Sequence, residues 1–238
     1  MEKVNIILPS KCLVYKDVDP SKIFIRTLKG KDEKLISELS MDNFDRKFTQ
    51  VLANVIEGVD PKLLTLGDRK YVMLWLAIHS FSKMHPVGFL CTNCLSKLEM
   101  EADLTTLTIK TLPDEFVEPY PITLSDNSTL NLRLFRVKDE LELAELEKSG
   151  TNIWLYRFAM SIIGTESIVE KVAFLENLPV IDIAKIRAFQ ERFDHGPTME
   201  TTFDCEKCGV TGVVPVPFRI EMFFPFGKQL ARYFGEAS

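Results

Sequence analysis

The sequence predicts an α+β protein in which helical regions flank a split zinc-ribbon-like β element that carries a long inserted β/helical segment. Stretches with helical periodicity and stretches with strand-like alternation follow one another along the 238 residues. Two Cys-x-x-Cys pairs, Cys91/Cys94 and Cys205/Cys208, each lie between strand-like segments. Hydrophobic residues make up 46% and charged residues 26% of the chain, which is enough apolar mass for a sizeable core.

These elements predict five parts along the chain. Residues 1–90 should hold a β-hairpin and a three-helix region, and residues 218–238 a Phe-rich C-terminal tail. Between them, residues 91–104 and 199–217 should form the two halves of a split zinc ribbon. Residues 105–198 are then an inserted β/helical region.

The first part carries two strand signals and three helix signals. Alternating residues predict strands at 4–8 and 22–26, which form a hairpin or belong to one sheet. Helices are expected over 32–39, from an N-cap at Asp42 or Asn43 to about Gly58, and over 66–81. The last of these is apolar on nearly every turn, so it should be the most buried of the three.

The rest of the chain alternates in the same way. A strand is expected at 98–102 after the first cysteine pair, and residues 125–128 have the composition of a hairpin turn. Helices are expected over 138–148, 153–163, 166–175 and 182–193, and strands over 199–203 and 209–216. No internal repeat of about 20–50 residues is visible. A cysteine knuckle flanked by strands does occur twice, each time beside a helical block.

The four paired cysteines predict one structural zinc site. A two-residue spacing lets both thiolates of a pair face the same ion, and four thiolates at ~2.3 Å complete a tetrahedral shell. Gly209 follows the second pair, where a knuckle needs a residue that accepts positive φ, whereas Leu95 holds the matching place after the first pair. Because residues 95–204 separate the pairs, the zinc would clasp the middle of the chain to its C-terminal quarter.

Other uses of these cysteines stay open from the residues alone. They are two independent reducible pairs, a redox dithiol and an iron–sulfur cluster. The expected strands on both sides disfavour a thioredoxin-type dithiol, which opens a helix. Cys12 has no partner in the sequence and is expected to be a plain small residue.

The residues do not indicate an enzyme. There is no nucleophile elbow, phosphate-binding loop or dinucleotide fingerprint. His79 should be structural and His195 should cap a helix end, while His85 is an alternative metal ligand. The net charge of −5 disfavours nucleic acid, although a zinc-ribbon nucleic-acid-binding or regulatory module remains the alternative function. No targeting signal or membrane span is visible, so a cytosolic protein is expected.

Several segments together resemble a known family. They are Ile7-Leu8-Pro9-Ser10-Lys11, residues 23–34, Leu64–Arg69 and the cysteine pair after the third expected helix. Over these segments the chain is similar to the baseplate hub proteins of T-even-type tailed bacteriophages, the phage base plate protein family. The similarity covers mainly residues 4–95, and the second Cys-x-x-Cys pair with its flanking strands also fits the family. Cys12 stands where a Gly is common in the family.

This resemblance implies a structural or assembly role at the tip of a contractile phage tail. It implies a hub component or a hub-assembly factor (a chaperone) that binds other baseplate and tail proteins. It implies location in the host cytoplasm during assembly and in the tail baseplate if the protein enters the virion. It implies no catalytic residues and no small-molecule substrate.

Overall fold

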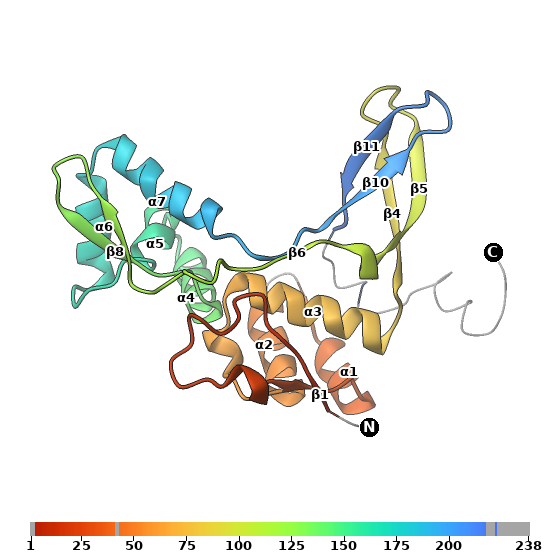
Figure 1. The fold of residues 1–238 in the computed structure, drawn as a ribbon, viewed down its shortest axis with the longest axis horizontal. Coiled ribbons are helices and arrows are strands. Elements are labelled where there is room, and N and C mark those ends of the chain that lie inside the picture. Colours follow the sequence, from red (N-terminus) through yellow and green to blue (C-terminus); the bar gives the residue numbers. More distant parts are fainter. Residues whose placement is uncertain (1–2, 41–42, 218–221, 223–238) are drawn as a thin grey trace.

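The computed structural model describes residues 3–40, 43–217 and 222. Its helices and small antiparallel sheets form an α+β fold, which confirms the expected class. Figure 1 shows an N-terminal group of helices, a second group of helices and strands, and an arm of two hairpins that projects away from both. The expected Phe-rich tail lies outside the described residues except for Met222, which is buried, and the expected N-cap Asp42 also lies outside them.

The N-terminal part combines one small sheet with three helices. β1 (Val4–Asn5), β2 (Phe24–Ile25) and β3 (Ile56–Glu57) form an antiparallel sheet with β2 in the middle. The helices are α1 (Gly30–Ile36), α2 (Phe44–Val55) and α3 (Leu66–Ser80), and single helical turns lie at Pro20–Lys22 and Pro61–Leu63.

Both predicted strands are therefore present and paired, but they are shorter than predicted. The second predicted helix was expected to continue to about Gly58, and this was wrong. It ends at Val55 because Ile56 takes an extended conformation, pairs with Ile25 and buries its side chain in the sheet. Sequence periodicity does not reveal this pairing partner.

The third helix is the most buried of the N-terminal helices, as predicted. It begins where the Thr65 side chain accepts a hydrogen bond from the amide of Asp68, the usual role of an N-cap threonine. Nine of its 15 residues are buried, against five of 12 in α2 and two of seven in α1. Hence α3 forms the centre of the larger hydrophobic core.

The second part has its own core. Its strands are β7 (Tyr120–Thr123) and β8 (Thr129–Leu132), and its helices are α4 (Val137–Lys148), α5 (Trp154–Ala159), α6 (Ile168–Glu176) and α7 (Val180–Arg192). A helical turn at Leu104–Thr106 and the pair of β6 (Ile109–Lys110) with β9 (Gly196–Pro197) lie between this part and the arm (Figure 1). The expected turn at 125–128 does join β7 to β8. Phe116, Phe158, Phe189 and Phe193 are buried in this core.

One predicted helix of this part is much shorter than expected. The helix expected over 153–163 ends at Ala159, because the chain then turns back onto β8. Ile162 forms a bridge with Leu132, and the amide of Ile163 donates to the carbonyl of Asn131. None of the helices in the described ranges is long and apolar enough to cross a membrane.

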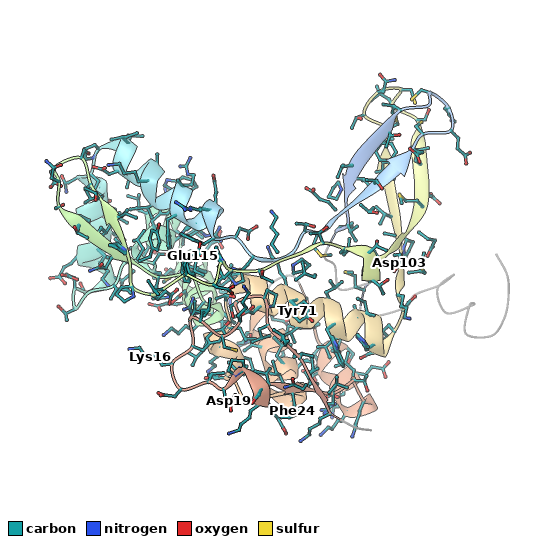
Figure 2. All side chains as sticks on the ribbon, viewed as in Figure 1. Lys16, Asp19, Phe24, Tyr71, Asp103 and Glu115 are labelled. Carbon is teal, nitrogen blue, oxygen red and sulfur yellow. The ribbon has the colours of Figure 1, made fainter. Side chains whose placement is uncertain are left out.

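The arm consists of two antiparallel hairpins. The first is β4 (Met84–Leu90) with β5 (Lys97–Asp103), and the second is β10 (Glu200–Asp204) with β11 (Thr211–Pro215). Their strands stand side by side in Figure 1, and Figure 2 marks Asp103 at the foot of the arm. β4 belongs to the arm, although the expected division placed residues up to 90 with the N-terminal helices. The five-part division itself stays a prediction.

Candidate metal centre

Each cysteine pair lies in the turn of one hairpin of the arm. The amide of Cys91 donates to the carbonyl of Ser96 and the amide of Leu95 donates to that of Cys91. In the second hairpin Cys205 and Gly209 make the corresponding bonds, to Val210 and to Cys205. These backbone bonds turn both sulfur atoms of a pair to one side of the knuckle.

The two knuckles use the same backbone conformation. Gly209 has a φ of 72°, as expected for a glycine after the second cysteine. Leu95 also takes the left-handed conformation, with a φ of 59°, although this costs an L-residue with a Cβ roughly 1 kcal/mol or more. The first knuckle therefore accepts a strained residue to keep the geometry of the second.

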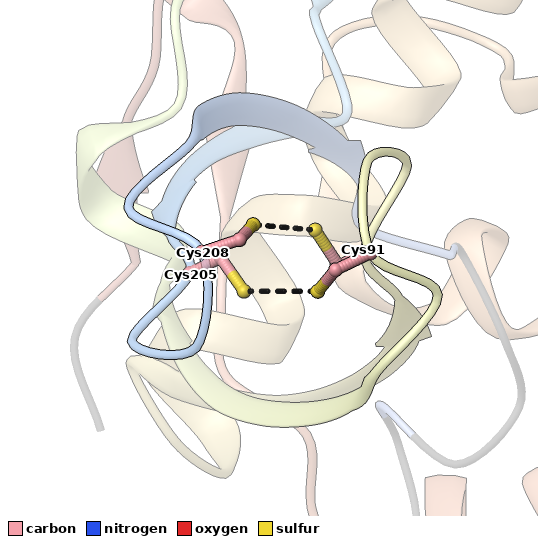
Figure 3. Close-up of side chains that lie close together, drawn as sticks. Cys91, Cys205 and Cys208 are labelled. Atoms are coloured by element: carbon pink, nitrogen blue, oxygen red, sulfur yellow. Dashed lines mark hydrogen bonds between the residues drawn. The ribbon is translucent and has the colours of Figure 1, made fainter.

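The four sulfur atoms meet at the tip of the arm. The Sγ atoms of Cys91 and Cys208 are 3.8 Å apart and those of Cys94 and Cys205 are 3.7 Å apart. Figure 3 shows these two contacts as parallel dashed lines between the knuckles. All four Sγ atoms lie within 4.8 Å of one another. Four thiolates at ~2.3 Å from one ion have tetrahedral edges of ~3.8 Å, so the donor set fits a tetrahedral ion.

The thiols differ in environment and acidity. Hydrogen bonds from Ser96 lower the pKa of the exposed Cys94 to about 6, and a hydrogen bond from the side chain of Asn93 lowers that of Cys208. Burial raises the pKa of Cys205 to about 11. Hydrogen bonding therefore favours deprotonation at two of the ligands, and a bound cation would favour ionisation of the buried one.

The geometry also bears on the other uses of these cysteines. All five cysteines are free thiols, and each pair lies in a β-turn and does not open a helix. A thioredoxin-type dithiol is therefore not supported. Four thiolates around one ion leave no position for substrate, which is the arrangement of a structural site.

The histidines lie elsewhere. His85 is buried but is not part of the four-residue cluster, so the structure does not bring it to the site. His79 bonds the carbonyl of Trp75 through Nδ1, within its own helix. His195 bonds the carbonyl of Phe193 at the end of α7 through Nδ1, at 2.9 Å, as a helix-end role requires. Cys12 is buried, far in sequence from the other thiols.

A buried polar network at the start of α3 was not visible in the sequence. Asp68 accepts hydrogen bonds from the amide of Ser10 and from the hydroxyl of Tyr15. The hydroxyl of Thr65 lies 2.6 Å from Nε2 of His195. In the neutral imidazole of His195, Nδ1 donates to the carbonyl at the end of α7 and Nε2 accepts from the hydroxyl of Thr65. Thr65 is only 1% exposed, so this pair ties segments together and is closed to a substrate.

Comparison with known proteins identifies one family. The family described as T4 bacteriophage base plate protein matches residues 4–225, which is nearly the whole chain. No curated protein and no solved structure matches the chain. The match extends far beyond the segments that carried the resemblance in the sequence.

Proposed function

Because the chain belongs to the T4 bacteriophage base plate protein family, we propose that it is a non-enzymatic hub or hub-assembly protein of a contractile tail. In this proposal it acts by binding other baseplate and tail proteins. One structural zinc ion, held by Cys91, Cys94, Cys205 and Cys208, stabilises it. It works in the host cytoplasm during assembly.

The observation that carries the zinc part is the convergence of four thiols from the two knuckles. Residues 95–204 separate the pairs, yet the sulfur atoms come within 4.8 Å of one another. Unpaired thiols do not need such proximity, whereas a tetrahedral ion does. The ion would hold the tip of the arm closed and supply no chemistry beyond that.

The arm also supports a binding role. Leu90, Leu95 and Val213 are 60%, 71% and 57% exposed, although each has a large apolar side chain. Exposed apolar side chains on a projecting element offer contact area to another protein. Residues 84–103 and 200–215 together hold six acidic residues and two lysines, a balance that disfavours the nucleic-acid alternative.

Elemental analysis of the purified full chain tests the zinc. We expect one zinc per chain, and loss of this zinc together with a lower melting temperature in Cys205→Ser. The matched control is Cys12→Ser, a buried cysteine outside the cluster, which should keep its metal. Absence of stoichiometric metal from the wild-type chain would falsify the zinc site, and iron in place of zinc would support the cluster alternative.

Mass spectrometry tests the place of the protein in assembly. Peptides of this chain in purified virions would identify a hub component. Peptides in baseplate intermediates from infected cells but not in virions would identify an assembly factor. Absence from both would contradict the proposed role.

A further inference from the structure

The same arrangement of contacts occurs twice in the chain. An arginine directly after a strand, Arg26 after β2 or Arg133 after β8, makes a forked ion pair with an aspartate six residues later, Asp32 or Asp139. The N–O distances are 2.7 and 3.1 Å in the first pair and 2.6 and 2.8 Å in the second. In both, the arginine also donates to the carbonyl of the next residue.

Both aspartates hold the start of a helix in the same way. Asp32 accepts from the amide of Lys29, and Asp139 accepts from the amide of Arg136. Each therefore closes the first turn of the helix that follows its strand, α1 or α4. The sequences agree as well, since Lys-Asp-Glu follows at the same distance from both arginines.

A second matched contact lies nearer to each cysteine pair. Asp68 and Asp182 are buried at the third position of α3 and α7, and each stands 23 residues before the first cysteine of its pair. Asp68 accepts from the amide of Ser10 at 2.8 Å, and Asp182 from the amide of Ser125 at 3.0 Å. Ser10 lies between β1 and β2, and Ser125 lies between β7 and β8, so both serines come from the loop of the preceding antiparallel pair.

The metal centre has the symmetry that this correspondence requires. Exchange of the two halves turns the contact of Cys91 with Cys208 into that of Cys205 with Cys94, and the two distances differ by only 0.1 Å (Figure 3). Phe89 and Phe203, each two residues before the first cysteine, meet each other at 4.6 Å between ring centroids. A residue that contacts its own equivalent lies beside a two-fold axis.

We infer that the chain is a tandem duplication of one structural unit, residues 4–103 and 120–215, with the metal centre on the pseudo-two-fold axis between the copies. Each unit contributes an antiparallel strand pair, an Arg–Asp clamp, helices and one knuckle hairpin. The region expected to be an insertion within a ribbon belongs mostly to the second unit. The two knuckle hairpins then form the contact between the two copies within the chain.

The two units differ in the helices that lie between the clamp and the knuckle hairpin. The first unit has two helices between its clamp and its cysteine hairpin besides the one that begins at its clamp, and the second unit has three. Spacing between the two aspartates therefore differs, whereas spacing from the second aspartate to the cysteines does not. This insertion hides the repeat from a search for a fixed period.

A knuckle exchange in the full-length chain tests this inference. Residues 91–96 are replaced by the sequence of 205–210, and residues 205–210 by that of 91–96. If the positions are equivalent, the exchanged protein keeps the metal content of the wild type and melts within about 3 °C of it. The matched control makes the same exchange with each inserted sequence shifted by one residue, which preserves the composition but misplaces the sulfur atoms. This control should lose the metal and melt well below the wild type.

The metal part of this inference rests on the proposed zinc site, and the outcomes separate the two. A wild-type chain without metal overturns the zinc site. The duplication is then tested by melting temperature alone, by comparing the exchanged protein with the displaced control. A metal-bearing wild type whose exchanged form loses metal and stability like the control overturns the duplication. An exchanged form that keeps both supports it.

Discussion

Gly67 and Gly30 offer a sharp test of how the two groups of helices fit together. Gly67 lies on the first turn of α3, against the backbone of His195, which has returned from the second part. A Cβ built on Gly67 would stand 2.2 Å from the carbonyl oxygen of His195 and 2.8 Å from its carbonyl carbon. A Cβ on Gly30, at the start of α1, would meet nothing within 4 Å.

The expected cost of Gly67→Ala follows from these distances. Ordinary contact begins at 3.4 Å, so the facing backbone must retreat by about 1 Å. Overpacking of this kind costs about 1–3 kcal/mol, and the retreat weakens the buried hydrogen bond between Thr65 and His195, worth about 1–3 kcal/mol if left unmade. The higher helix propensity of alanine offsets up to about 1 kcal/mol of this loss of stability. The net loss is about 2–4 kcal/mol, or about 5–15 °C in melting temperature.

Thermal and urea unfolding followed by circular dichroism measure this difference. Gly30→Ala should leave stability unchanged or raise it by up to about 1 kcal/mol, because it adds helix propensity without a clash. The reasoning is refuted if Gly67→Ala is as stable as Gly30→Ala. Equal destabilisation by both would also refute it, because the cost would then not come from the contact with His195.

Three further predictions concern the clamps, the knuckles and the unpaired thiol. Asp32→Ala should lower the free energy of unfolding by about 3–5 kcal/mol in chemical denaturation, because it removes the ion-pair partner of the buried Arg26. Asp139→Ala should cost less, because the side chain of Arg133 is 23% exposed against 9% for Arg26. Equal losses in the two variants would contradict this reasoning. Leu95 and Gly209 both have positive φ, which an L-residue adopts at a cost and glycine does not. Leu95→Gly should therefore leave stability unchanged or raise it by up to about 1 kcal/mol, and Gly209→Ala should lower it by about 1 kcal/mol. Opposite signs in thermal melts would show that backbone conformation does not determine stability at these positions. Burial, with Asp68 and Asp19 nearby, raises the pKa of Cys12 from 9.0 to about 11, so the folded state keeps the thiol proton to higher pH than the unfolded state. The stability that this thiol contributes is therefore present below pH 9 and is lost as pH rises toward 11. Cys12→Ala should lose less stability than the wild type between these pH values, and parallel losses would sink the idea.

Local signals in the sequence were sufficient for most of the helices. The apolar run that begins at Leu66 marked the start of α3, and the end of the helix was placed within one residue. The turn at 125–128 was identified from its polar residues alone. Such features depend on neighbours along the chain, which a sequence displays directly.

Pairings between distant segments were not available in the same way. β3 was mistaken for the end of a helix because its partner Ile25 lies far back in the chain. α5 was predicted too long because its last expected turn is used by a bridge to Leu132. In both places a tertiary contact overrode a plausible local pattern.

The buried aspartates show the same limit at the level of side chains. Asp68 and Asp182 look like ordinary solvated residues at the start of a helix. Only the folded chain brings the amides of Ser10 and Ser125 to them. Recognition of the two halves as equivalent required these contacts, because the spacing between the matched residues is interrupted.

The sequence by itself determined the candidate ligands, since two Cys-x-x-Cys pairs predict knuckles wherever they lie. It also carried enough of the family pattern to indicate a phage base plate protein, which the match over residues 4–225 confirms. Only the tertiary structure decided that the pairs meet, and that they meet as equivalent halves. The reason is physical: spacing within a knuckle is set by a few backbone bonds, whereas the distance between knuckles depends on the packing of every element between them.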